Sequence, residues 1–149
     1  GGMCGSMFEV IKLLSEKEQV DPDRVSITGN SWGGAVMGAV VASSFMVEPK
    51  GIFAAAVPVA CKGFGFDERV AKNVAVSGFV GSGDRRRAGG MQGAAKTFNE
   101  KGGYMECTVI QGANHGNTFR EALKHDLFLP WLIKQKRGND LSKLKAKTE

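Results

Sequence analysis

The stretch VSITGNSWGG at residues 25–34 decides how the rest of the sequence is interpreted. Its first half is short and β-branched, which is typical of a strand. Its second half matches the pattern G-x-S-x-G around Ser31, and small residues with helical spacing follow over residues 33–45. A strand that turns into a helix at a central serine is the context in which this pattern holds an exposed nucleophile.

The residue types in this stretch fit the demands of such a turn. Ser31 has to lie on a backbone so sharply bent that it is strained, which lifts the hydroxyl off the end of the sheet. Side chains two positions before and after the serine would collide in this turn, which explains Gly29 and Gly33. Gly34 adds further room. The hydroxyl then lies at a helix N-terminus, and the backbone N–H of Trp32 is the candidate oxyanion-hole donor. The alternative is a glycine-rich turn whose serine caps the helix.

Apolar runs alternate with helical periodicity along the chain. The expected strands lie at residues 25–28, 52–59, 74–80 and 104–110, and the expected helices at residues 3–18, 33–45, 89–100 and 117–136. We expect Pro130 to break the last helix. Continuous apolar strands that alternate with helices predict an α/β fold with a parallel sheet covered on both faces.

Residues 21–34 resemble the D-x-x-R-strand-G-x-S-x-G-G segment of α/β-hydrolases. The resemblance is closest to phospholipase/carboxylesterases, polyhydroxybutyrate-depolymerase-like esterases and predicted peptidases. Residues 53–59 resemble the strand that follows the elbow helix in these branches, and residues 130–137 resemble their terminal helix. The resemblance covers most of residues 1–137 and implies the α/β-hydrolase fold, a parallel sheet flanked by helices.

Only the C-terminal part of that fold is expected in this chain. In α/β-hydrolases further strands precede the helix at residues 3–18, and a loop after one of them gives the second oxyanion-hole N–H. We expect an upstream segment to complete the enzyme, and the alternative is a truncated relative with little activity. The expected organisation is a catalytic core at residues 1–137 and a basic, disordered tail at residues 138–149.

The nucleophile needs a base, which is usually a histidine oriented by a carboxylate. The chain has two histidines. His115 follows the expected strand at residues 104–110, at the end of the strand where catalytic groups of parallel sheets collect. His125 falls inside the expected last helix and is interpreted as a surface residue. We therefore expect His115 to be the base.

The expected carboxylate is Asp84, which follows the strand at residues 74–80. The families that the sequence resembles carry their catalytic aspartate at this place in an H-G-x-x-D pattern, and Val80 here replaces the histidine of that pattern. The chain order serine, aspartate, histidine is the order expected for the fold. Asp67 is the alternative carboxylate.

An arginine run at residues 85–87 follows Asp84, where those families continue with a short apolar stretch. A solvated basic loop is the favoured interpretation, because exposed charges usually have weak effects. A basic rim that attracts an acidic substrate is a second interpretation. A third is that one arginine pairs with Asp84 and weakens its hold on His115.

Composition excludes several classes of protein. Hydrophobic residues make up 42% and charged residues 23% of the chain, as in globular proteins, and no apolar run reaches the roughly 20 residues of a membrane helix. Most of the formal charge of +5 lies in residues 134–149, so the body is nearly neutral and nucleic-acid binding is not expected. Three cysteines without metal-type spacing favour a reducing, cytoplasmic compartment, although an upstream targeting signal stays open.

These patterns predict a serine hydrolase that cleaves carboxylic esters through an acyl-enzyme on Ser31. Asp84 and His115 would complete the catalytic triad, and the N–H of Trp32 would bind the oxyanion. A small ester is the expected substrate, and neither a metal nor an organic cofactor is expected. The alternatives are a serine peptidase of the same fold and a non-catalytic remnant of an α/β-hydrolase.

Overall fold

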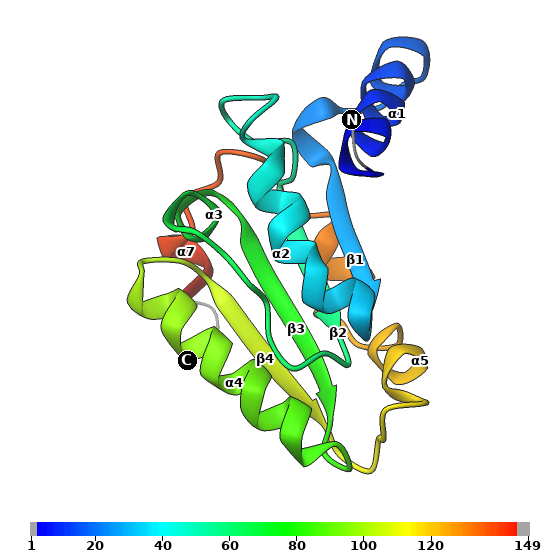
Figure 1. Ribbon diagram of the computed structural model, residues 1–149, viewed down its shortest axis with the longest axis vertical. Coiled ribbons are helices and arrows are strands. Elements are labelled where there is room, and N and C mark those ends of the chain that lie inside the picture. The colour runs from blue at the N-terminus through cyan, green and yellow to red at the C-terminus, as the bar shows by residue number, and fades with distance from the viewer. Residues whose placement is uncertain (1–2, 146–149) are drawn as a thin grey trace.

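The apolar and β-branched runs of the sequence form one parallel sheet. The structure is a computed structural model that describes residues 3–145. Its sheet has the strand order β1-β2-β3-β4, with every neighbouring pair parallel (Figure 1). The strands are β1 (Ser26–Asn30), β2 (Ala55–Val59), β3 (Ala75–Gly81) and β4 (Met105–Ile110). All residues of β2 and β3 are buried, as expected for central strands covered on both faces.

Helices cover the two faces of the sheet and enclose two apolar cores (Figure 1). The first face is covered by α1 (Met3–Lys17), α2 (Trp32–Ser44), α3 (Glu68–Asn73) and α4 (Arg85–Glu100). The second face is covered by α5 (Thr118–Ala122), α6 (Leu129–Leu132) and the segment leading to α7 (Ser142–Lys145). This arrangement confirms the α/β fold with a doubly covered parallel sheet.

The structure corrects two helix boundaries. The helix expected at residues 89–100 begins four residues earlier, at Arg85, so the arginine run is helical and not a loop. The helix expected at residues 117–136 is two short helices separated by turns at residues 123–128. Pro130 does not break it, because the proline lies in the first turn of α6, where its missing N–H has no helical acceptor to lose.

The short helix α3 was not expected. Asp67 precedes it and accepts a hydrogen bond from the backbone N–H of Val70 at 3.0 Å, which caps the helix. Asp67 Oδ2 also pairs with Arg69 at 2.7 Å. Both oxygens of this alternative carboxylate therefore serve α3, and the alternative assignment of Asp67 to the site is not supported.

The end of the chain packs on the second face as far as it is described. Leu141 is 8% exposed and belongs to the apolar core under α5 and α6. The segment expected as a disordered tail therefore contributes to the core up to α7, and residues 146–149 lie outside the described residues. Within residues 3–145, no helix has the length and apolar character required to cross a membrane.

The parallel arrangement brings three loops to one edge of the sheet. The strands β1, β3 and β4 all point the same way and end at Asn30, Gly81 and Ile110. Gly81 and Ile110 are paired in register, so the segments that follow them leave the sheet side by side. The residues after β1, β3 and β4 therefore meet at the carboxyl edge, where ligands bind in sheets of this kind.

Candidate active site

Ser31 joins β1 to α2 through a strained turn. Its φ is 55° and its ψ is −116°, a conformation that non-glycine residues rarely adopt. The turn is held by a hydrogen bond of 2.8 Å from the Ser31 N–H to the carbonyl of Val59 on β2. Such strain persists only where the surrounding structure over-determines it, and it clusters at functional sites.

Close backbone packing explains two of the glycines around Ser31. A Cβ on Gly29 would lie 2.8 Å from the carbonyl carbon of Gly33, and a Cβ on Gly34 would lie 2.8 Å from the carbonyl oxygen of Gly29. A Cβ on Gly33 would meet nothing within 4 Å. The expectation that Gly33 avoids a collision is therefore wrong, and Gly34 is the residue that packs against Gly29.

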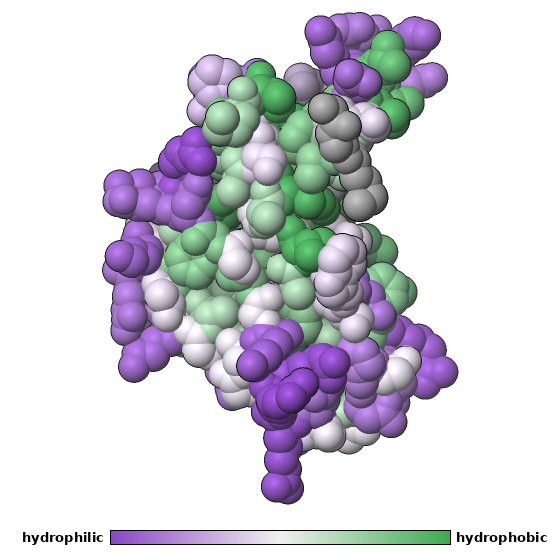
Figure 2. All heavy atoms as spheres, in the orientation of Figure 1, coloured by the Kyte–Doolittle hydropathy of each residue, from purple (hydrophilic) through white to green (hydrophobic). Residues whose placement is uncertain are grey.

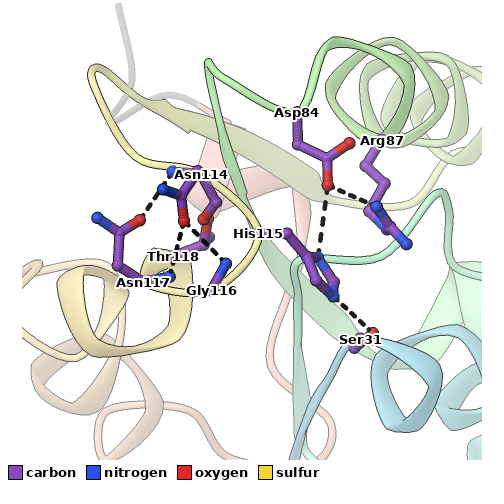
Figure 3. Close-up of polar contacts among 8 residues, drawn as sticks. All are labelled: Ser31, Asp84, Arg87, Asn114, His115, Gly116, Asn117 and Thr118. Carbon is purple, nitrogen blue, oxygen red and sulfur yellow. Dashed lines mark hydrogen bonds and ion pairs between the residues drawn. The ribbon is translucent and has the colours of Figure 1, made fainter.

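The side chain of Ser31 points to His115 and does not cap the helix. Ser31 is the N-cap residue of α2, but its side chain makes no capping hydrogen bond. Its Oγ lies 3.0 Å from Nε2 of His115, 84 residues later in the chain (Figure 3). The alternative of a merely capping serine is therefore not what the structure shows.

A network of hydrogen bonds between side chains and backbone around Asn114 fixes the loop that carries His115 (Figure 3). Asn114 Oδ1 accepts hydrogen bonds from the N–H groups of Gly116 at 2.9 Å and Asn117 at 3.3 Å. The carbonyl of Asn114 accepts from the Thr118 hydroxyl at 2.6 Å. His115 is therefore presented by a turn that leads directly into α5.

Asp84 approaches the other ring nitrogen of the histidine. Its Oδ2 lies 3.4 Å from Nδ1 of His115, and its side chain is 15% exposed. Like Ser31, Asp84 is an N-cap residue whose side chain makes no capping bond, here at the start of α4. The structure therefore brings together Ser31, His115 and Asp84. These three residues are far apart in the sequence and are the ones that the sequence predicts for the site.

The loops carrying Asp84 and His115 are bonded to each other. The Gly83 N–H donates to the carbonyl of Ala113 at 2.9 Å, and the Gly112 N–H donates to the Ser82 hydroxyl at 2.9 Å. A Cβ on Gly81 would clash with the Ala113 carbonyl, so the two loops approach as closely as their backbones allow. These contacts therefore hold the loops that carry Asp84 and His115 side by side.

Arg87 is a site residue that the sequence suggested only as one of three interpretations. Its Nη1 donates to Oδ2 of Asp84 at 2.6 Å, the same oxygen that faces His115 (Figure 3). Burial alone would raise the pKa of Asp84, but the hydrogen bond and charge of Arg87 bring that pKa below its usual value. The arginine follows the aspartate by three residues at a helix start, a spacing that predicts contact once the helix boundary is correct.

His125 and Trp32 are the other two residues that the sequence singled out. His125 lies in a bend between α5 and α6, not in a helix, and its ring packs edge-on against Phe79 at 5.4 Å. Trp32 is the first residue of α2, where a backbone N–H has no acceptor within the helix, and its side chain is 72% exposed. Among residues 3–145, no cluster of three or more histidine, cysteine or acidic side chains could hold a metal ion.

Comparison with known proteins rests on structure. No protein-family model and no curated protein matches the sequence. A thermostable esterase superposes with a TM-score of 0.67 at 22% identity, over 89% of this chain and 36% of its own. This chain has the α/β-hydrolase fold.

Two further α/β-hydrolases support the same conclusion. A fungal esterase from Rhizomucor miehei matches with a TM-score of 0.69 at 11% identity, over 98% of this chain and 60% of its own. An acylaminoacyl peptidase from Pyrococcus horikoshii matches with a TM-score of 0.63 at 17% identity, over 91% of this chain and 28% of its own. The chain thus spans less than two thirds of the length of each of these α/β-hydrolases.

Proposed function

We propose that this chain carries the catalytic residues of a serine hydrolase that cleaves carboxylic esters. The observation that supports this most directly is the 3.0 Å contact between Ser31 Oγ and His115 Nε2 at a strained turn. A hydroxyl within hydrogen-bond reach of an imidazole, with a carboxylate behind the imidazole, is the arrangement that activates a serine nucleophile.

The reaction proceeds by two acyl transfers. Nε2 of His115 accepts the proton of the Ser31 hydroxyl while Oγ forms a bond to the ester carbonyl carbon. The resulting oxyanion is stabilised by the backbone N–H of Trp32 and by the N-terminal end of α2. His115 then gives its proton to the leaving alkoxide as the carbon–oxygen bond breaks. A water molecule repeats the sequence on the acyl-enzyme, which releases the acid and restores Ser31.

Asp84 stabilises the imidazolium that forms in each step. Its carboxylate lies on the Nδ1 side of the ring, opposite the side that faces Ser31 (Figure 3). A carboxylate in this place favours the tautomer with the proton on Nδ1, which leaves Nε2 free to accept a proton. We assign an ester substrate because two of the three solved structures compared above are esterases.

Labelling with a fluorophosphonate probe tests the proposal. The probe reacts with activated serines, so the intact mass of the protein should increase by one adduct, whereas the Ser31→Ala variant should gain none. Ser43→Ala is the matched control, because the Ser43 hydroxyl donates to the carbonyl of Ala39 within α2 and lies outside the site. An unlabelled parent protein, or labelling that survives Ser31→Ala, would contradict the proposal.

Matched substrates then separate esters from peptides. Because an alkoxide leaves more easily than an amine, the proposal predicts a kcat/KM for an acyl ester at least two orders of magnitude above that for the amide with the same acyl group. Comparable values for the two substrates would favour a serine peptidase, which is the function in the name of the Pyrococcus horikoshii protein.

A further inference from the structure

We propose that Arg87 is a positioning residue that competes with His115 for one oxygen of Asp84 and thereby holds the site in a less reactive arrangement. This inference rests on the proposed function, because it assigns Arg87 a role in controlling the same reaction. Arg87 touches neither Ser31 nor His115 in any hydrogen bond of the described residues, so its effect is exerted through Asp84.

The distances favour the arginine. Arg87 Nη1 lies 2.6 Å from Asp84 Oδ2, which is short even for a charge-assisted hydrogen bond. His115 Nδ1 lies 3.4 Å from the same oxygen, beyond the usual range for N–H···O hydrogen bonds. Nδ1 of His115 is buried and has no hydrogen-bond partner among the described residues. A buried imidazole nitrogen without a partner is unusual and needs a physical reason.

Charge adds to the effect of distance. The Asp84 side chain is 15% exposed and the Arg87 side chain 32%, so water screens this pair less than an open surface pair. The guanidinium neutralises much of the negative charge that would otherwise stabilise an imidazolium at His115. Arg87 therefore lowers both the hydrogen-bonding and the electrostatic support that the carboxylate gives to the base.

Arg87 is the charged neighbour that acts on Asp84 and His115. Cys61 follows β2 and is influenced by the charge of Arg87, but burial raises the pKa of its thiol to about 11, so the thiol is neutral at pH 7. Arg85 and Arg86 are exposed, and Figure 2 shows hydrophilic side chains gathered over the start of α4. Arg85 therefore serves as a matched control for the loss of one positive charge.

Nuclear magnetic resonance of the histidine ring N–H protons tests this inference without requiring turnover. The chain has two histidines, and His125, which packs against Phe79, is the internal reference. We expect Arg87→Met to move the Nδ1 proton resonance of His115 downfield, because the hydrogen bond to Asp84 shortens, and Arg85→Met to leave this resonance in place. Arg87→Gln is made in parallel, since either variant alone could fail to fold.

A double-mutant cycle with Asp84→Asn separates competition for the carboxylate from a direct effect of charge. If Arg87 acts through Asp84, removing the arginine in the Asp84→Asn background should shift the Nδ1 proton resonance of His115 by less than a third of the shift seen in the parent. A full shift in that background would overturn the inference, because Arg87 would then act by its charge alone.

Fluorophosphonate labelling provides the kinetic readout. Arg87→Met should label several-fold faster than the parent at the same pH, and Arg87→Lys, which keeps the charge, should label at close to the parental rate. Slower labelling of Arg87→Met, or an unchanged Nδ1 proton resonance of His115, would overturn the inference and make Arg87 a structural partner of Asp84. Failure of the serine to label in every variant would contradict the proposed function alone, because the resonance of His115 would still report on Arg87.

Discussion

Two turns at the carboxyl edge of the sheet each present a site residue, but different contacts hold the two residues in place. The turn from β1 into α2 presents Ser31, and the turn from β3 into α4 presents Asp84, each as an N-cap residue that does not cap. Glycine packing and a backbone hydrogen bond to Val59 fix the first turn. Oδ2 of Asp84, in contrast, faces both Arg87 and His115. Close backbone packing therefore fixes the position of Ser31. Competition between Arg87 and His115 determines how strongly Asp84 can assist the base.

The largest expected effect comes from breaking the turn that is set by sterics. Gly29→Ala places a Cβ 2.8 Å from the backbone of Gly33, so the turn must open. We expect a loss of about 3 kcal/mol in the free energy of unfolding, measured by chemical denaturation. Gly33→Ala is the control, because its Cβ meets nothing within 4 Å, and it should change stability by less than about 1 kcal/mol. Equal losses for the two variants would show that close packing does not fix this turn.

Removing the negative charge from the second turn should have the next largest effect. Asp84→Asn deprives His115 of a carboxylate, and we expect fluorophosphonate labelling to slow by about two orders of magnitude. This is less than the roughly four orders lost where an aspartate is fully bonded to the catalytic histidine, because Arg87 already draws the carboxylate away. A loss of four orders would mean that the histidine holds Asp84 during the reaction, and the contrast between the two turns would disappear.

The smallest expected effect concerns the loop that carries the base. Asn114→Ala removes the acceptor for the N–H groups of Gly116 and Asn117, which should cost about 1 kcal/mol of stability and slow labelling a few-fold. Asn114→Asp keeps that acceptor and should remain close to the parent in both measurements. If the alanine variant labels at the parental rate, then packing and not this network positions His115.

The backbone of the site could be predicted from the sequence because its signals are local. The β-branched run before Ser31, and the place of His115 after an apolar run, both follow from rules about single strands and turns. Asp84 was selected from its place after an apolar run and from the resemblance to α/β-hydrolases, and it follows β3 in the structure. The structure agrees with these placements, and the catalytic roles of the three residues stay predictions.

What could not be predicted depends on contacts between distant segments. The sequence prediction began helix α4 at residue 89 and left the preceding arginines in a loop. In the structure a Cβ on Gly90 would clash with the Lys62 carbonyl, so this glycine allows α4 to pack closely against the loop after β2. Only with the helix extended back to Arg85 does Arg87 reach Asp84. The sequence therefore suggested a pair between an arginine and Asp84 as one of three interpretations, and the structure identifies Arg87 as the arginine that forms it.

The strained backbone at Ser31 has a practical consequence for engineering. Glycine is the residue that accepts a φ of 55° most readily, so replacing the serine by glycine would relax the turn. A library screened for heat resistance alone would therefore tend to discard the nucleophile, and a screen that also demands probe labelling would retain it. Stabilising substitutions for this scaffold are better sought on the second face of the sheet, between α6 and α7, away from the turns that carry the site.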